Sequence, residues 1–185
     1  MGCSTHTLAG LAQSTCETNL AGIKKAYIAN YENVIVSAIT FEGGSVESAY
    51  TISEIVMASG KKFYAYNFAK QTGSLTSTLT KDETNGTRYY TNEAALQFNK
   101  MEAKKHLEMA ALCADPTAVI ILDNNGKYWF LGYDSYVSAS EGTTQTGQSF
   151  DDLNGYNLTL QAQSAYLPIE VKATAIAGIV EEVEA

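Results

Sequence analysis

The chain has little proline, cysteine or histidine, with 2, 3 and 2 of these among its 185 residues. An odd number of cysteines argues against a disulfide framework and fits synthesis in a reducing cytosol. No apolar run reaches the length needed to cross a membrane. The first residues lack the basic start and apolar core of a secretion signal. We therefore expect neither a membrane protein nor a disulfide-stapled secreted one.

Positive charge is also scarce. Lysine and arginine together number 12 against 20 aspartate and glutamate residues, which gives a formal net charge of −8. Proteins that grip phosphate backbones need clustered cations, so this balance argues against a protein that binds nucleic acid through its phosphates. It does not exclude a surface past which nucleic acid moves without adhering.

Motifs for catalysis are missing: there is no Gly-rich phosphate loop, no Ser-centred elbow and no HExxH pattern. Cys3, His6 and Cys16 offer three soft or borderline metal ligands. A zinc site would need a fourth ligand such as Glu17, and the spacing matches no standard pattern. Packing of small side chains is the favoured interpretation. We predict that the protein is not an enzyme and holds no metal or cofactor.

A nucleophile pair formed by His106 and Cys113 is conceivable on one predicted helix, because seven residues return to about the same face. Two turns separate them by about 10 Å, however, which is too far for a hydrogen bond. Cys113 is instead expected to be a buried small hydrophobe. His106 is expected to be exposed beside Lys104 and Lys105.

The segment from Tyr89 to Leu131 carries the clearest structural pattern. Residues 90–98 alternate apolar and polar side chains, which predicts a strand. A helix is predicted after Asn99 as N-cap, with one apolar stripe made of Ala103, Leu107, Ala110, Ala111 and Ala114. Residues 118–122 predict a strand buried on both faces, followed by an Asn-Gly hairpin turn and a return strand over 127–131.

The rest of the chain is rich in tyrosine and threonine, which favours β structure. We expect further strands over 24–31, 61–68, 74–80 and 156–162, and a weaker one over 34–41. Residues 45–59 are ambiguous, and the polar segment 134–152 is expected to be a long loop. The predicted fold is mainly β (α+β): an antiparallel β-sandwich or barrel with one flanking α-helix and extended terminal arms. An N-terminal assembly arm would span 1–22, the sandwich 23–171 and a C-terminal arm 172–185.

Three segments in order, Gly22–Ile28, Asn124–Gly132 and Gly147–Leu160, resemble the tail tube (major tail) proteins of long-tailed bacteriophages. The resemblance covers roughly residues 22–171 and consists of turn and strand signatures. It implies a structural virion protein, assembled in the host cytoplasm, whose six copies form a ring with joined sheets around a lumen. Rings would stack into a tube through loops and arms, with tape measure, sheath or terminator proteins as other partners.

Ring closure would remove unpaired strand edges, which are otherwise a liability. An acidic lumen would keep DNA from adhering as it passes. Glu42, Glu47, Asp82 and Glu83 are candidates for lumen-facing acids, with an ordinary solvated position as the alternative for each. Two other functions stay open. One is the inner tube of a contractile injection system, and the other is a ligand- or glycan-binding β-sandwich that uses tyrosines as stacking platforms.

Overall fold

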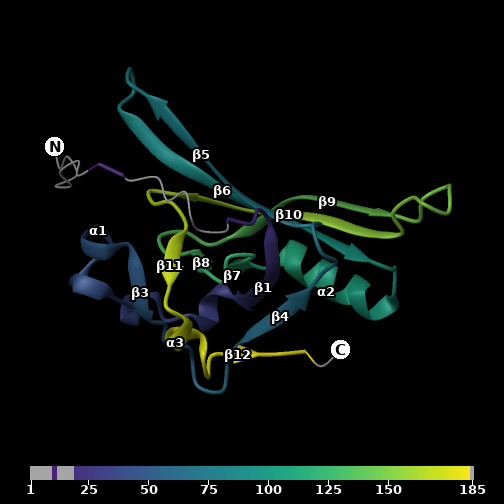
Figure 1. Cartoon of the computed structure of the whole chain (residues 1–185), viewed down its shortest axis with the longest axis horizontal. Coiled ribbons are helices and arrows are strands. Elements are labelled where there is room, and N and C mark those ends of the chain that lie inside the picture. Colours follow the sequence, from purple (N-terminus) through teal and green to yellow (C-terminus); the bar gives the residue numbers. More distant parts are fainter. Residues whose placement is uncertain (1–9, 12–18, 184–185) are drawn as a thin grey trace.

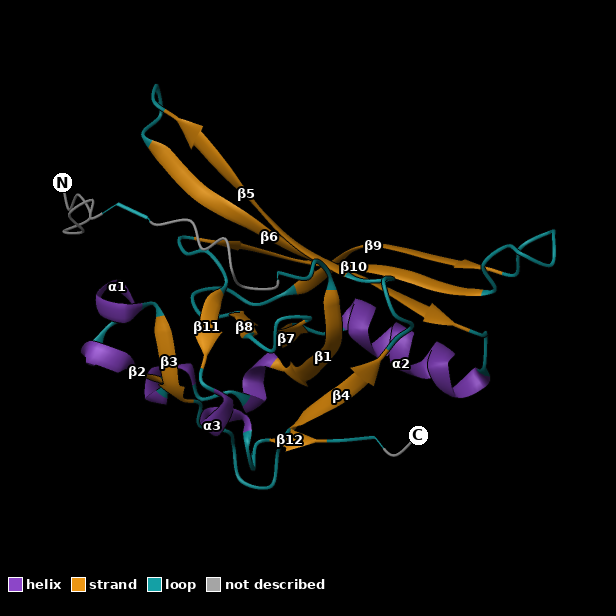
Figure 2. Cartoon of the chain, viewed as in Figure 1, coloured by secondary structure: helices purple, strands orange, loops and turns teal. Residues whose placement is uncertain are grey.

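Alternating apolar residues produce two sheets that pack face to face, one of eight strands and one of four (Figures 1 and 2). The computed structural model describes residues 10–11 and 19–183. The larger sheet curls into a half-barrel beside the smaller one. The mainly β fold expected from the sequence, a sandwich or barrel flanked by helix, is confirmed.

The eight-stranded sheet has the order β12-β4-β1-β7-β8-β11-β3-β2. Its pairs are antiparallel except for β11 with β3 and β12 with β4, which are parallel. These parallel pairs lie toward the two ends of the sheet. Apart from β4, their strands are only two to four residues long, which is too short to show periodicity in the sequence. The strands are β1 (Ile23–Asn30), β2 (Thr40–Phe41), β3 (Thr51–Glu54), β4 (Phe63–Asn67), β7 (Thr117–Asp123), β8 (Tyr128–Leu131), β11 (Ile169–Val171) and β12 (Val180–Glu181).

The four-stranded sheet has the order β5-β6-β10-β9, and all its pairs are antiparallel. Its strands are β5 (Ser74–Asp82), β6 (Thr87–Asn99), β9 (Ser138–Gln145) and β10 (Gly155–Ser164). The expectation of a loop over 134–152 is wrong for the part that forms β9. This strand is exposed along most of its length, so backbone pairing with β10 orders it and apolar burial contributes little.

Two groups of buried side chains hold the molecule together. One lies between the two sheets and includes Leu96, Phe98, Leu158 and Leu160. The other fills the curl of the eight-stranded sheet and includes Phe130. The four-stranded sheet therefore has one face on the core and one face free of it.

Helix α2 (Ala103–Ala114) is present as predicted, but its boundary and its buried side differ from expectation. Glu102 is the N-cap, and Asn99 ends β6 instead. Leu107 is 75% exposed, whereas Leu112 is buried. Leu112 and the partly buried Met109, three residues apart on the helix, form the inward stripe against the core, and Leu107 lies outside it.

Residues 31–49 form mostly short helical turns, although a strand was the weaker expectation over 34–41. The 3-10 turns are η1 (Tyr31–Asn33), η2 (Val36–Ala38) and η3 (Glu42–Gly44), and a single helical turn α1 (Val46–Ala49) follows. Of the expected strand over 34–41, only Thr40–Phe41 is extended within a sheet. This segment covers one end of the half-barrel (Figure 1).

Both terminal segments contact the domain within the described residues. Near the N-terminus, the Asn125 side chain binds the backbone of Leu20, and Asn124 Nδ2 donates to the carbonyl of Ala21. Near the C-terminus, α3 (Ala173–Ile176) precedes β12, and Glu182 accepts hydrogen bonds from Lys25 and Tyr27 at 2.6 and 2.9 Å. The predicted C-terminal arm is thus attached to the sheet as far as these residues.

Candidate functional site

The free face of the four-stranded sheet is polar and has few charges. Strand register places its residues side by side across all four strands. Three are carboxylates, and none of the described strand residues on this face is a lysine or an arginine. The face is made of Ser74, Thr76, Thr78, Thr80 and Asp82 from β5; Thr87, Tyr89, Thr91, Glu93, Ala95 and Gln97 from β6; Asn157, Thr159, Gln161 and Gln163 from β10; and Ser138, Glu141, Thr143 and Gln145 from β9.

Glu93 lies near the middle of this polar face. Its partner across β10 is Gln161, whose Nε2 donates a hydrogen bond to Glu93 Oε1 at 2.6 Å. Bonds to an ionised acceptor are stronger than bonds between neutral groups, so this pair fixes the position of the carboxylate on the free face. The face therefore presents an anchored negative charge among hydroxyl and amide groups.

Both outer edges of this sheet are open in the described chain, because β5 pairs only with β6 and β9 only with β10. Strand directions alternate, so β5 and β10 run one way and β6 and β9 the other. A second copy's β9 laid against β5 would therefore run antiparallel to it. A bulge at Ser140 interrupts β9, and the stretch from Glu141 to Gln145 keeps regular pairing.

The predicted lumen acids fall into two separate places. Asp82 and Glu83 lie at the tip of the β5–β6 hairpin, where Lys81 pairs with Glu83 at 2.7 Å. Backbone hydrogen bonds from Asn85 and Thr84 lower the pKa of Asp82. Asp82 thus shapes the hairpin tip and stays charged.

Glu42 and Glu47 lie in η3 and α1, beside the eight-stranded sheet, and Glu42 pairs with Lys172. The structure does not bring them to the polar face. Sequence reasoning missed Glu93 and Glu141 on that face. The alternation within 90–98 could have pointed to Glu93, whereas Glu141 could not be found because its strand was not recognised.

The other candidate residues are the three possible metal ligands and the His106–Cys113 pair. Cys3, His6 and Cys16 lie outside the described residues. Among the residues described, no three His, Cys, Asp or Glu side chains are placed to hold a metal ion. His106 is exposed, as expected, and its ring packs edge-on against Tyr156 at 5.4 Å between centroids. Cys113 is exposed, so the expectation that it is buried is wrong.

An apolar hollow of about 430 Å³ lies between α2 and strands β1 and β4. Ile28, Ala65 and Leu112 line it, with Tyr66 and Glu108 among its polar members. Tyr66 Oη donates to Glu108 Oε2 at 3.0 Å, and burial raises the pKa of the tyrosine. Because these two polar groups are hydrogen-bonded to each other, the hollow is better suited to an apolar ligand than to acid–base chemistry.

Comparisons with protein-family models, with curated proteins and with solved structures find no match to this chain. None of the helices in the described ranges has the length and apolar character needed to span a membrane.

Proposed function

We propose that the chain is the tube-forming subunit of a bacteriophage tail, in which copies join through the edges of the four-stranded sheet. The main support is that β5 and β9, the two edge strands of this sheet, have unpaired outer edges in the described residues, run in opposite directions and can pair between copies. The described strand residues of its polar face also include no lysine or arginine. A head-to-tail contact of unlike surfaces closes into a ring when the rotation allows. Joining β9 of one copy to β5 of the next extends one antiparallel sheet without interruption.

The proposed ring has a size that suits a conduit. Six copies of a four-stranded sheet would contribute about 24 strands at ~4.8 Å spacing with a tilt near 40°, which gives a backbone diameter of about 50 Å. The free face would line the lumen, and the eight-stranded sheet would form the outer wall. Such a lumen leaves room for a nucleic-acid duplex after side chains are included.

The chemistry of the free face supports passage of nucleic acid without binding. Retention of DNA depends mainly on cations that neutralise phosphates, and this face offers none among its described strand residues. Asp82, Glu93 and Glu141 add like charge that repels the phosphates. An inner tube of a contractile injection system would share the same architecture and differ in its cargo.

The test is negative-stain microscopy of the purified chain, together with sedimentation of variants in β5. Neighbouring residues of an edge strand direct their N–H groups to opposite sides, and proline removes the N–H. Of Ser77→Pro and Thr78→Pro, one should disturb pairing with β6 and the other only the outer edge. The variant that keeps the wild-type thermal transition should sediment as single chains, while the wild type forms rings and tubes. A wild type that stays a single chain at all concentrations would contradict the proposal.

The apolar hollow beside α2 favours a second candidate function, binding of an apolar small molecule. A binding module of this kind would elute at the mass of one chain, and a Leu112→Trp substitution that fills the hollow would remove binding. Ring formation by the wild type, unchanged in Leu112→Trp, would instead favour the tube.

A further inference from the structure

We infer that Phe150 of one copy inserts into an apolar hollow under the β5–β6 hairpin of another copy, and that this contact stacks one ring on the next. The inference rests on the proposed function, because it assumes rings. It assigns a specific anchor and a specific receiving surface to the stacking contact. Both surfaces belong to this chain, so the partner is a second copy.

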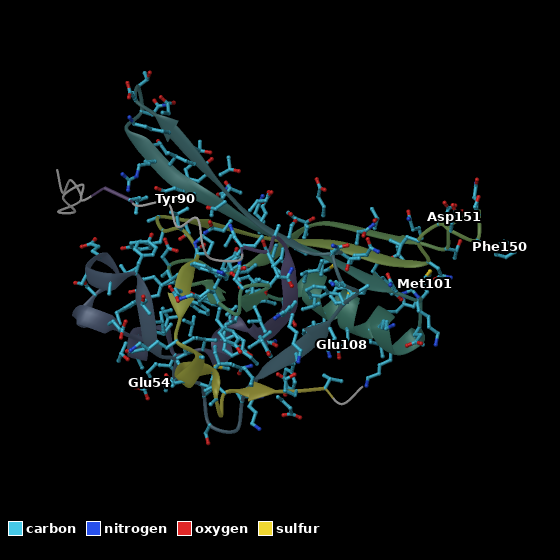
Figure 3. All side chains as sticks on the ribbon, in the orientation of Figure 1. Glu54, Tyr90, Met101, Glu108, Phe150 and Asp151 are labelled. Carbon is cyan, nitrogen blue, oxygen red and sulfur yellow. The ribbon has the colours of Figure 1, made fainter. Side chains whose placement is uncertain are left out.

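The anchor lies at the tip of the β9–β10 hairpin, which extends well beyond the body of the molecule (Figure 3). The Phe150 side chain has a relative exposure of 114%, so its ring touches almost nothing in its own chain. The tip itself is ordered by Asp152, whose Oδ2 accepts hydrogen bonds from the backbone of Gln148 and Ser149 at 2.8 Å each. Because the backbone of the tip is already ordered, docking of Phe150 costs little backbone freedom, which favours binding.

The receiving surface lies under the β5–β6 hairpin. A hollow of about 370 Å³ is lined there by Leu75, Trp129, Leu167 and Pro168, together with Tyr50, Thr76 and Ser77. The same face of the hairpin continues the apolar surface outward through Leu79, which is 50% exposed, and through its cross-strand partner Tyr90. We call this surface the hairpin hollow. An aromatic ring fits a hollow of this size, and aromatic anchors in apolar pockets carry much of the energy of protein interfaces.

The Phe150 tip and the hairpin hollow lie apart along the sheet and do not meet within one copy. The hollow begins near mid-sheet, where Leu75 pairs with Ala94, and its apolar surface continues through Leu79 toward the β5–β6 tip. β5 runs toward its hairpin tip at 83–86, and β10 runs in the same direction away from the tip at 146–154. Figure 3 shows Tyr90 and Phe150 on opposite sides of the molecule. In a ring with strands inclined along the axis, the two tips point to opposite faces of the ring, so one face carries anchors and the other carries hollows.

Charges at the two surfaces are complementary. Asp151 and Asp152 stand beside Phe150 on the tip. Arg88 lies on the same face of the hairpin as Leu79, opposite Lys81, whose charge Glu83 already pairs at 2.7 Å. Opposite charges at the rim of an apolar contact favour correct pairing more than they add affinity.

The experiment uses Phe150→Ala in the full chain, with Leu107→Ala on α2 as a control that removes an equally apolar and largely exposed side chain elsewhere. Ring formation is followed by sedimentation and tube length by negative-stain microscopy. Phe150→Ala should keep rings and raise the concentration needed for tubes by about tenfold or more. Leu107→Ala should match the wild type in both readouts.

A charge exchange makes the assignment of the partner surface specific. Asp151→Lys and Arg88→Glu should each shorten the tubes, and the double variant should restore them because every tip then meets a hollow of reversed sign. Tubes of wild-type length in Phe150→Ala, or no restoration of tubes in the double variant, would overturn this inference. If these proteins still form rings, the proposed function is unaffected. Absence of rings from the wild type would instead overturn the proposed function.

Discussion

Replacing Gly155 with alanine should separate the β10 and β6 strands at one end of the four-stranded sheet. A Cβ at this position would lie 2.1 Å from the carbonyl oxygen of Phe98 and 3.1 Å from the Cα of Asn99. The β6 backbone would have to move by roughly 1 Å to reach even the shortest contact that real Cβ atoms make, and close-packed interiors resist such a shift.

The shift also threatens the hydrogen bonds beside this position. Lys100 N donates to the Asn154 carbonyl at 2.6 Å, and Met101 N donates to Asn154 Oδ1 at 3.2 Å. Losing two such bonds at about 1 kcal/mol each, with ~1 kcal/mol of packing strain, gives a loss of about 2–4 kcal/mol in the free energy of unfolding. For a chain of this size the melting temperature should fall by about 5–15 °C.

Gly142→Ala is the matched control, because Gly142 lies in the neighbouring strand β9 of the same sheet. Its nearest neighbour for a Cβ is Leu158 Cδ1 at 3.7 Å, an ordinary contact. This substitution should change stability by less than about 1 kcal/mol and can be stabilising, since alanine restricts the unfolded chain. Both variants are measured by urea unfolding followed with Trp129 fluorescence. Equal midpoints for Gly155→Ala and Gly142→Ala would refute the close-approach argument.

Three further substitutions or truncations probe packing, pH dependence and assembly. Leu160→Ala should lower the free energy of unfolding by about 2–5 kcal/mol, because Leu160 is 0% exposed between the sheets. Leu79→Ala should lower it far less, because Leu79 is 50% exposed. Similar urea midpoints for the two variants would contradict this prediction. The hydrogen bond from Lys25 lowers the pKa of Glu182, so the carboxylate should stabilise β12 fully above about pH 4.3 and less as the pH falls further. Amide exchange of β12 should show this pH dependence in the wild type, and Glu182→Gln should abolish it. Removing residues 1–22 should leave a folded domain with impaired stacking, and long tubes from the truncated chain under the electron microscope would count against it.

The sequence alone determined the strands whose apolar side chains alternate. Residues 90–98 and 156–162 lie in β6 and β10, and the doubly apolar run 118–122 lies in β7. The physical reason is local: a side-chain period of two puts one apolar row against the core whatever the partner strand is. The mainly β fold with a flanking helix followed from these segments.

Only the tertiary structure decided the features that depend on neighbours across a sheet. β9 has almost no apolar signal and becomes a strand because β10 supplies its hydrogen-bond partners. The need for glycine at position 155 comes from a β6 carbonyl that no local pattern reveals. The polar face that carries Glu93 and Glu141, with its two open edges, exists only once four distant segments are aligned, because register, and not composition, places those side chains together.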